Sequence, residues 1–216
     1  MVQKFSDYKH IIWDWNGTLL NDAWLCVEVM NGMLAKRGLK QVSLEFYRSV
    51  FTFPVRDYYD KLGYDFEKES FEKVGMEFMV LYNARQKESR LHSEALTVLQ
   101  AFRDKGFAQS ILSAREQGEL RAEVNLMGVN SFFDKVYGTD DHYAHGKTEV
   151  GIRLVKDLGV PINRLLFIGD TRHDAEVASE IGIDCILIPD GHHTEDRLRQ
   201  CGFPVISGIN ELIRHI

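Results

Sequence analysis

The chain has 216 residues, a net charge of −6 and 44% hydrophobic residues. A chain of this length forms one large domain or two smaller ones, with a substantial core. The negative charge, with no basic run to offset it, argues against a nucleic-acid partner. The apolar runs are strand-sized and far shorter than the ~20 residues that cross a bilayer, so no membrane association is expected.

The N-terminal segment and the cysteines indicate a cytoplasmic protein. Residues 1–7 contain no apolar run of the kind that a secretory signal carries. The cysteines at positions 26, 185 and 201 are too few and too widely spaced for a disulfide framework or a zinc site. We therefore expect small buried thiols in a reducing compartment. No sequence feature indicates an oligomeric state.

The first element expected along the chain is a buried strand over residues 8–14. Its near-continuous apolar character is typical of a strand that is covered on both faces. The strand ends at Asp14, and in open α/β folds ligands bind at the carboxyl edge of the sheet. The pair Asn16-Gly17 lets the backbone turn sharply beside Asp14 and present its N–H groups there.

The next part of the chain, to about residue 90, has helical periodicity and almost no strand signal. Asn21 or Asp22 is expected to cap its first helix, and Ser43 its second. The aromatic residues recur at helical spacing, which predicts core packing. This block is therefore predicted to be a helical subdomain inserted into another domain, with helices over 22–38, 43–50, 55–62 and 65–88.

From residue 92 onward, strands alternate with helices. Strands are expected over 107–112, 132–138, 165–168, 184–188 and 204–206. One of the helices between them begins at Lys147 and ends at Gly159. This alternation predicts parallel βαβ units with right-handed crossovers. The expected fold is α/β, a Rossmann-like parallel sheet with helices on both faces (1–20 and 91–216) plus an inserted all-helical domain (21–90).

Polar side chains fall where the strands of this sheet end or its helices begin. Asp14 and Ser113 each follow a strand. Lys147 opens a helix, and Asp170 and Asp174 follow a later strand. Because the carboxyl ends of parallel strands meet at one edge, these side chains are expected to converge.

This set of side chains fits phosphoryl transfer. A carboxylate such as Asp14 that attacks a phosphate monoester needs fixed positive charge, which Lys147 can supply. The Ser113 hydroxyl and backbone N–H groups can bind the phosphate oxygens. The aspartates offer the oxygen ligands that Mg²⁺ prefers, and the metal would shield the phosphate from the carboxylates.

At these positions the chain resembles the haloacid-dehalogenase-like hydrolase superfamily, in particular its phosphoglycolate-phosphatase-like branch. Residues 14–22 (Asp-Trp-Asn-Gly-Thr-Leu-Leu-Asn-Asp) resemble the first family motif. Ser113 resembles the second motif, Lys147 the third and residues 169–174 the fourth. The resemblance covers essentially the whole chain, and the helical block lies where that branch carries a mobile cap domain. It implies a Mg²⁺-dependent phosphohydrolase that acts on a small phosphorylated metabolite through an aspartyl-phosphate at Asp14.

The resemblance also implies a role for each site residue. The catalytic residues would be Asp14, Asn16 and Lys147. Mg²⁺ would be bound by Asp14, the backbone carbonyl of Asn16, Asp170, and Asp174 directly or through water. Substrate contacts would come from the turn after the nucleophile, the end of the second strand and the cap, namely from Trp15, Thr18, Ser113, Ala114 and Arg56.

Asn16 departs from the phosphatase pattern. Family phosphatases carry an Asp two residues after the nucleophile, which protonates the leaving alkoxide and later activates the hydrolytic water. An amide cannot transfer a proton, and such help is worth roughly 10²–10⁴-fold in rate. The enzyme is therefore expected to be slow, restricted to good leaving groups such as acyl phosphates, or dependent on another proton shuttle, for which His173 is a candidate.

Asn16 also leaves two alternatives open. The first is a non-catalytic or weakly active relative that binds a phosphorylated ligand or a partner protein. The second, less favoured, is a phosphonatase, which has a small residue at this position and a cap lysine that forms a Schiff base; the cap of this chain contains Lys36, Lys40 and Lys61. Dehalogenases have an aromatic residue at this position and lack the acidic cluster of the fourth motif.

The histidines outside these motifs are expected at the periphery of the site. His192 and His193 are adjacent in a loop, and neighbouring loop residues rarely bind one ion without further ligands. A position at the surface or the rim is therefore expected for them. His142 and His145 flank Lys147 and are also expected near the rim.

Overall fold

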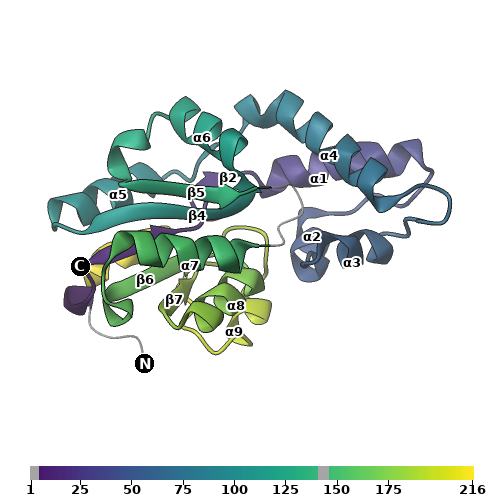
Figure 1. The fold of residues 1–216 in the computed structure, drawn as a ribbon. Coiled ribbons are helices and arrows are strands. Elements are labelled where there is room, and N and C mark those ends of the chain that lie inside the picture. The colour runs from purple at the N-terminus through teal and green to yellow at the C-terminus, as the bar shows by residue number, and fades with distance from the viewer. Residues whose placement is uncertain (1–4, 141–145) are drawn as a thin grey trace.

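A computed structural model describes residues 5–140 and 146–216 of the chain. At its centre lies a five-stranded parallel sheet with the strand order β5-β4-β1-β6-β7 (Figure 1). The predicted α/β fold is confirmed. The expected strand over 204–206 is reduced to one bridge between Leu187 and Val205. The strands are β1 (His10–Trp13), β4 (Ala108–Glu116), β5 (Lys135–Thr139), β6 (Leu165–Gly169) and β7 (Asp184–Leu187).

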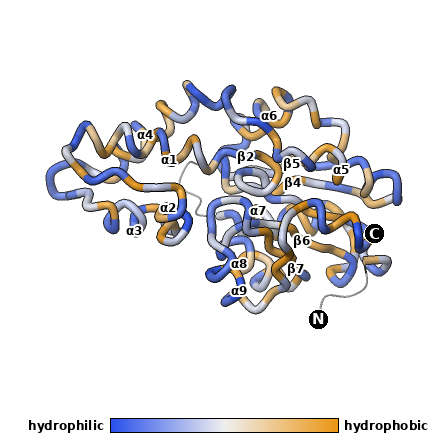
Figure 2. The backbone as a smooth tube through the Cα atoms, turned by 180° about the vertical axis from the view of Figure 1, so that it is seen from behind, coloured by the Kyte–Doolittle hydropathy of each residue, from blue (hydrophilic) through white to orange (hydrophobic). Residues whose placement is uncertain are grey.

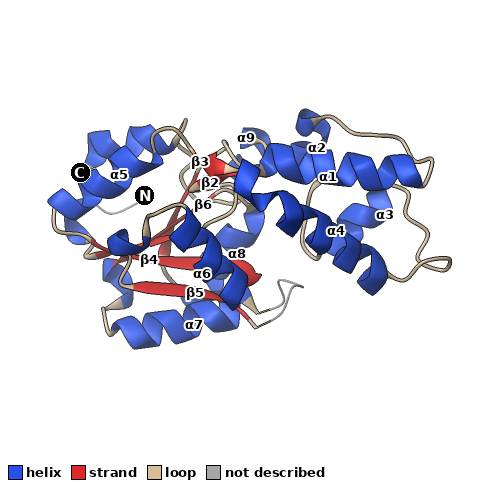
Figure 3. Cartoon of the chain, turned by 90° about the horizontal axis from the view of Figure 1, so that it is seen from above, coloured by secondary structure: helices blue, strands red, loops and turns tan. Residues whose placement is uncertain are grey.

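Helices cover both faces of the sheet (Figures 1 and 3). One face carries α5 (Ala95–Asp104) and α6 (Gln117–Leu126). The other face carries α7 (Lys147–Leu158), α8 (Arg172–Ile181) and α9 (Glu195–Arg199). The chain also contains short 3-10 helices, at Phe5–Asp7, Gln86–Glu88, Asn130–Phe132, Ile162–Arg164 and Ile209–His215.

The central strand β1 contributes to the apolar cores on both faces. Ile11 and Trp13 pack into the cluster beneath α5 and α6, whereas Ile12 packs into the cluster beneath α7 and α8. This alternation follows from the two-residue repeat of a strand. It explains the near-continuous apolar run in the sequence, and Figure 2 shows the same hydrophobic colour along β6 and β7.

The helical block has an apolar core of its own. Its cluster of buried side chains is drawn entirely from residues 23–82. Ser43 caps the second helix by accepting a hydrogen bond from the Phe46 N–H, as predicted. The last helix begins at Phe71 instead of 65, because Ser70 caps it. The helices are α1 (Ala23–Lys36), α2 (Leu44–Val50), α3 (Val55–Lys61) and α4 (Phe71–Arg85).

A small antiparallel sheet lies where the chain enters and leaves the helical block. In it, β2 (Leu20–Asn21) pairs with β3 (Arg90–Leu91). These strands were not predicted, because two residues are too few to show a strand periodicity. The proposed domain boundaries at 20/21 and 90/91 fall within this sheet and stay a prediction.

The described part of the chain bears on two further expectations. None of its helices is long and apolar enough to cross a membrane. The three cysteines are unpaired, as expected. Cys185 is buried, whereas Cys26 and Cys201 are partly exposed.

Candidate active site

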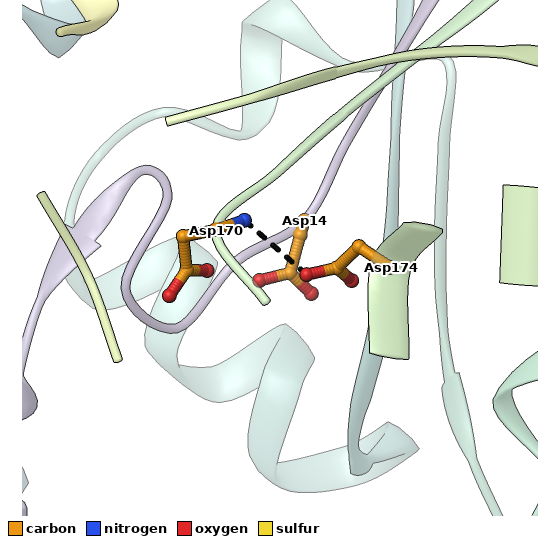
Figure 4. A group of neighbouring side chains, drawn as sticks. All are labelled: Asp14, Asp170 and Asp174. Atoms are coloured by element: carbon orange, nitrogen blue, oxygen red, sulfur yellow. Dashed lines mark hydrogen bonds between the residues drawn. The ribbon is translucent and has the colours of Figure 1, made fainter. Parts of the chain in front are cut away.

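The side chains of Asp14, Asp170 and Asp174 lie together at the carboxyl edge of the sheet (Figure 4). Asp14 directly follows β1, Asp170 directly follows β6, and Asp174 lies in the first turn of α8. One carboxylate oxygen from each residue lies within 4.8 Å of the other two, and all three residues are buried. The structure thus brings together three side chains that the strand ends predicted to converge.

Lys147, the first residue of α7, joins two of these carboxylates. Its Nζ donates a hydrogen bond to Asp14 Oδ1 and another, of 2.5 Å, to Asp174 Oδ1. Burial lowers the pKa of Lys147, but the two carboxylates outweigh burial, and the resulting pKa lies above the usual value. Three carboxylates and one ammonium leave two net negative charges, which a divalent cation would neutralise.

The pKa values of the three carboxylates reflect their burial and the charges around them. Burial raises the pKa of Asp14 well above its usual value; Lys147 opposes that shift, and Asp174 and Asp170 add to it. Burial also raises the pKa of Asp170. For Asp174, Lys147 outweighs burial and the pKa is lowered. A buried set of oxygen donors with surplus negative charge fits a hard divalent cation such as Mg²⁺.

The second oxygen of Asp174 is occupied within the protein. Oδ2 accepts hydrogen bonds from the N–H groups of Asp170 and Thr171 and from the Thr171 hydroxyl. The Asp174 N–H in turn donates to the Thr171 hydroxyl, which completes a capping box at the start of α8. Both oxygens of Asp174 are therefore engaged within the protein, Oδ1 by Lys147 and Oδ2 by the start of α8.

The turn after Asp14 is fixed by Asp22, whose importance the sequence did not reveal. The Asn16 amide donates hydrogen bonds to Asp22 Oδ2 (2.9 Å) and to the Tyr82 hydroxyl (3.1 Å). Asp22 also accepts from the Gly17 N–H at 3.0 Å and from the Tyr82 hydroxyl at 2.8 Å. Asp22 is 1% exposed and makes no capping hydrogen bond in α1. It was expected only as a cap, and instead it holds the Asn16 amide in one orientation.

His192 is a second site residue whose position was not predicted. Its Nδ1 shares a 2.8 Å hydrogen bond with the Tyr47 hydroxyl, and its Nε2 lies 3.4 Å from Asp22 Oδ1. Its backbone N–H donates to Asp170 Oδ2 at 2.6 Å. Burial lowers the pKa of His192, but Asp22 and the neighbouring aspartates outweigh burial and raise it to about 9. The imidazole is therefore cationic at neutral pH and adds positive charge beside the turn.

The expectation that His192 and His193 lie at the surface or the rim is wrong. They are 6% and 1% exposed, and His193 Nδ1 accepts a hydrogen bond from the Arg172 N–H. Their loop folds onto Asp170 because Gly191 has no side chain; a Cβ there would collide with the Asp170 carboxylate. A glycine before the histidine pair was the one sequence signal for this close approach.

The side chains of Trp15 and Thr18 form hydrogen bonds within the protein and do not line the cavity. The Trp15 side chain is fully buried, and its indole N–H donates to Glu123 Oε2 at 3.0 Å. The Thr18 hydroxyl donates to Asp170 Oδ1 at 2.8 Å. Neither residue lines the cavity described below. Any contact of Trp15 with substrate would come from its backbone N–H.

Ser113 and Ala114 line the same cavity as Asp14, and their contact with phosphate stays a prediction. The prediction that the strand ends before Ser113 is wrong, because β4 continues to Glu116 with a shift in register after Leu112. Such an irregularity re-aims side chains at a sheet edge. The Ser113 hydroxyl accepts a hydrogen bond from the Arg115 N–H at 3.2 Å.

A cavity of about 620 Å³ extends from Asp14 into the helical block. Arg56 lines it, is exposed, and places its guanidinium 4.9 Å from the centre of the Phe66 ring. His173 lines it as well, and its Nε2 is buried with no hydrogen-bond partner among the described residues. His173 therefore stays a candidate proton shuttle. His142 and His145 lie outside the described residues.

The lysines expected in the helical block do not reach the cavity. Among the described residues, Lys147 is the one lysine that lines it. Lys36, Lys40 and Lys61 are all exposed, and Lys36 pairs with Glu77. No cap lysine is thus placed to form a Schiff base, which argues against the phosphonatase alternative.

The structure combines a Rossmann-like sheet, buried carboxylates and a lysine at its carboxyl edge, and an inserted helical block that faces them. This combination defines a class of α/β hydrolytic enzymes. The sequence profile of haloacid dehalogenase-like hydrolases matches residues 11–188. The chain belongs to this family and is a hydrolase, as its motifs predicted.

Curated relatives and solved structures support the assignment. A phosphoglycolate phosphatase of Rhodobacter capsulatus is 24% identical over 188 residues, which cover 84% of this chain and 84% of the relative. A probable phosphatase of Dickeya dadantii is 29% identical over 47% of this chain and 44% of its own. In fold, a haloacid dehalogenase-like hydrolase of Streptococcus pneumoniae matches 97% of this chain and 98% of its own, with a TM-score of 0.83 at 18% identity. The expected likeness to the phosphoglycolate-phosphatase-like branch is confirmed.

Proposed function

We propose that the protein is a Mg²⁺-dependent phosphohydrolase that acts on a small phosphorylated metabolite through an aspartyl-phosphate at Asp14. The observation that carries this proposal is the buried group of Asp14, Asp170 and Asp174 with Lys147 bonded between two of them, at the inner end of a cavity. The phosphatase names of the curated relatives support it. We also propose a cytoplasmic location.

The residues divide the proposed reaction between them. An oxygen of Asp14 forms a bond to phosphorus while the bond from phosphorus to the leaving oxygen breaks, and water later cleaves the acyl phosphate. Lys147 places its ammonium beside Asp14, where it offsets repulsion between the carboxylate and the phosphate. Ser113 and the N–H groups of Trp15 and Ala114 would bind the phosphate oxygens. Arg56 would contact the rest of the substrate.

The metal would be held by the carboxylates of Asp14 and Asp170 and by the Asn16 carbonyl, with Asp174 through water. When bound, a divalent cation would polarise the phosphoryl group and neutralise the surplus negative charge. Asp170 is kept in place by Thr18 and by the His192 N–H, at 2.8 and 2.6 Å. These two hydrogen bonds set its carboxylate toward Asp14 before any metal binds.

A screen of phosphate esters and acyl phosphates tests the proposal. Turnover is expected with Mg²⁺ and is expected to disappear when EDTA removes the metal. Phosphate release measures the turnover, and ribose 5-phosphate, phosphoglycolate, phenyl phosphate and acetyl phosphate sample the leaving groups. If none of these compounds is hydrolysed with Mg²⁺, the phosphohydrolase proposal fails and a ligand-binding relative is left.

The exchange of Asn16 and Asp22 is expected to raise turnover. Asn16→Asp alone would place a second carboxylate about 2.9 Å from Asp22 Oδ2, and like charges at that distance cannot both ionise readily. The double variant Asn16→Asp/Asp22→Asn keeps one amide and one carboxylate, now with the acid at position 16. It is expected to gain up to roughly 10²–10⁴-fold on alkyl phosphates, and more than the single variant.

The control for this exchange is Asp22→Asn, which is expected not to gain activity. Steady-state rates with an alkyl phosphate compare the four proteins. Equal gains in the single and the double variants would show that Asp22 does not restrain position 16. No gain in either would show that the residue at position 16 does not limit the rate.

A further inference from the structure

The wall of the cavity that belongs to the helical block is largely aromatic and apolar. One face of α4 contributes Gly75, Met76 and Met79 to it, at helical spacing. The segment before α3, α3 itself and the start of α4 add further side chains, among them Phe51, Phe53, Tyr59 and Phe71. The charged residues of the helical block in this lining are Asp22, Arg56 and Glu72, and the remainder of the wall favours an apolar group of the substrate.

The size of the cavity exceeds what a small phosphorylated acid needs. Its volume of about 620 Å³ lies within the range of roughly 300–1,000 Å³ found for pockets that enclose drug-sized ligands. A phosphate with a two-carbon acid, as in phosphoglycolate, would leave the apolar wall uncovered. Burying an aromatic ring there instead would be favourable in proportion to the apolar area removed from water.

Of the two arginines that line the cavity, Arg115 is already engaged. Its Nε lies 2.9 Å from Glu123 Oε2, and its Nη2 donates to Asn83 Oδ1 at 2.8 Å. Arg56 lies over the ring of Phe66, and the carboxylate of Glu72 also lines the cavity. A second anionic group on the substrate would compete with the contacts of Arg115 and share the cavity with Glu72, so the part of the substrate beyond the phosphate is best uncharged.

The amide of Asn16 also favours a substrate with an aromatic leaving group. Its amide cannot protonate a leaving oxygen, and both of its described hydrogen bonds go to Asp22 and Tyr82. An aromatic alcohol has a pKa of about 10, as for tyrosine, so it departs as an anion far more readily than an alkyl alcohol. Aromatic phosphate esters therefore fit the apolar wall of the cavity. Their leaving group also departs more readily without protonation by an acid at position 16.

From these two independent observations we infer that the substrate is an aryl phosphate monoester, whose ring occupies the cavity between α3, α4 and Asp14. The inference rests on the proposed phosphohydrolase function and names its substrate class.

Gly75→Leu tests the inference by filling the cavity. A Cβ at Gly75 would meet no heavy atom within 4 Å, and a leucine within α4 has a better helix propensity than glycine. The added side chain therefore enters the cavity without straining the helix. The matched control is Gly32→Leu in α1, where a Cβ also meets nothing within 4 Å but the residue does not line the cavity.

The substrates for this test are 1-naphthyl phosphate and acetyl phosphate, which both have good leaving groups but differ in size. Gly75→Leu is expected to lower kcat/KM for 1-naphthyl phosphate by about tenfold or more, with a change of less than about twofold for acetyl phosphate. Gly32→Leu is expected to change neither. Unchanged hydrolysis of 1-naphthyl phosphate by Gly75→Leu would overturn the inference.

A binding measurement separates failure of the inference from failure of the proposed function. Titration calorimetry with 1-naphthylphosphonate and methylphosphonate, neither of which has an ester bond to cleave, reports occupancy without turnover. Tighter binding of the naphthyl compound, lost in Gly75→Leu and kept in Gly32→Leu, supports an aromatic occupant even if no ester is hydrolysed. Equal binding of the two compounds overturns the inference, even if acetyl phosphate is hydrolysed and the phosphohydrolase function stands.

Discussion

Asp14→Asn is expected to lower phosphate-ester turnover by at least about 10⁴-fold, because loss of a nucleophile removes the covalent route altogether. The fold should survive. Asp14 is buried, and burial raises the pKa of its carboxyl, so an uncharged amide of the same shape is tolerated there. Steady-state phosphate release measures the loss, and circular dichroism checks the fold.

Two further measurements show whether the loss has the expected cause. Acid quenching with a radiolabelled phosphate ester should trap label on the wild-type protein and none on Asp14→Asn. The control is Asp184→Asn, at the start of β7, where the carboxylate accepts a hydrogen bond from the Tyr8 hydroxyl and does not line the cavity. Labelled protein or near-normal turnover in Asp14→Asn would exclude Asp14 as the nucleophile.

The site residues that could be predicted are those next to clear strand ends or helix starts in the sequence. Asp14 and Asp170 directly follow strands whose apolar runs are buried on both faces of the sheet. Lys147 follows a glycine and begins α7 at the predicted residue. Parallel strands bring their carboxyl ends to one edge, so these positions converge without any knowledge of tertiary contacts.

The part that could not be predicted depends on contacts between distant segments. Asp22 looked like a helix cap, and only the packed structure places it against His192, at the other end of the chain. The register shift after Leu112 depends on how β4 pairs with β5, so β4 continued past Ser113 without a local signal. Trp15 was expected to contact the substrate, and the sequence did not show that its side chain points into the core, where it is buried and hydrogen-bonded to Glu123.

These contacts change how the amide at position 16 is understood. From the sequence, Asn16 was understood only as the loss of the acid–base aspartate. In the structure it is a donor to Asp22, and Asp22 in turn faces the imidazole of His192. Asn16→Asp alone therefore adds a negative charge beside Asp22, and it is expected to gain less activity than the exchange of both residues.

Lys147→Met is expected to destabilise the protein by about 3–5 kcal/mol at neutral pH, because it leaves buried carboxylates without their counter-charge. Turnover should fall by about 10²–10³-fold or more, since a positive charge beside the reacting phosphate is lost. Denaturant unfolding measures the free energy. The control is Lys156→Met, at an exposed position in the same helix.

The pH dependence of this destabilisation has a definite sign. Lys147 lowers the pKa of Asp174 below the usual value of 3.8, so the pair contributes stability above that pH and loses it as the carboxylate is protonated. The difference in stability between wild type and Lys147→Met should therefore be largest at neutral pH and shrink as the pH falls below about 4. A difference that does not depend on pH would mean that Lys147 acts through its packing alone.

The same variant tests the charge argument for the metal. Without the ammonium, the three carboxylates retain three negative charges when ionised, instead of two net charges. Added Mg²⁺ should therefore raise the melting temperature of Lys147→Met more than that of wild type, because ligand binding to the folded state stabilises it in proportion to affinity. Asp14→Asn removes one carboxylate and should show the smallest increase. The order Lys147→Met, wild type, Asp14→Asn is the result expected if the carboxylates bind the cation, and the reverse order would contradict a metal site at these residues.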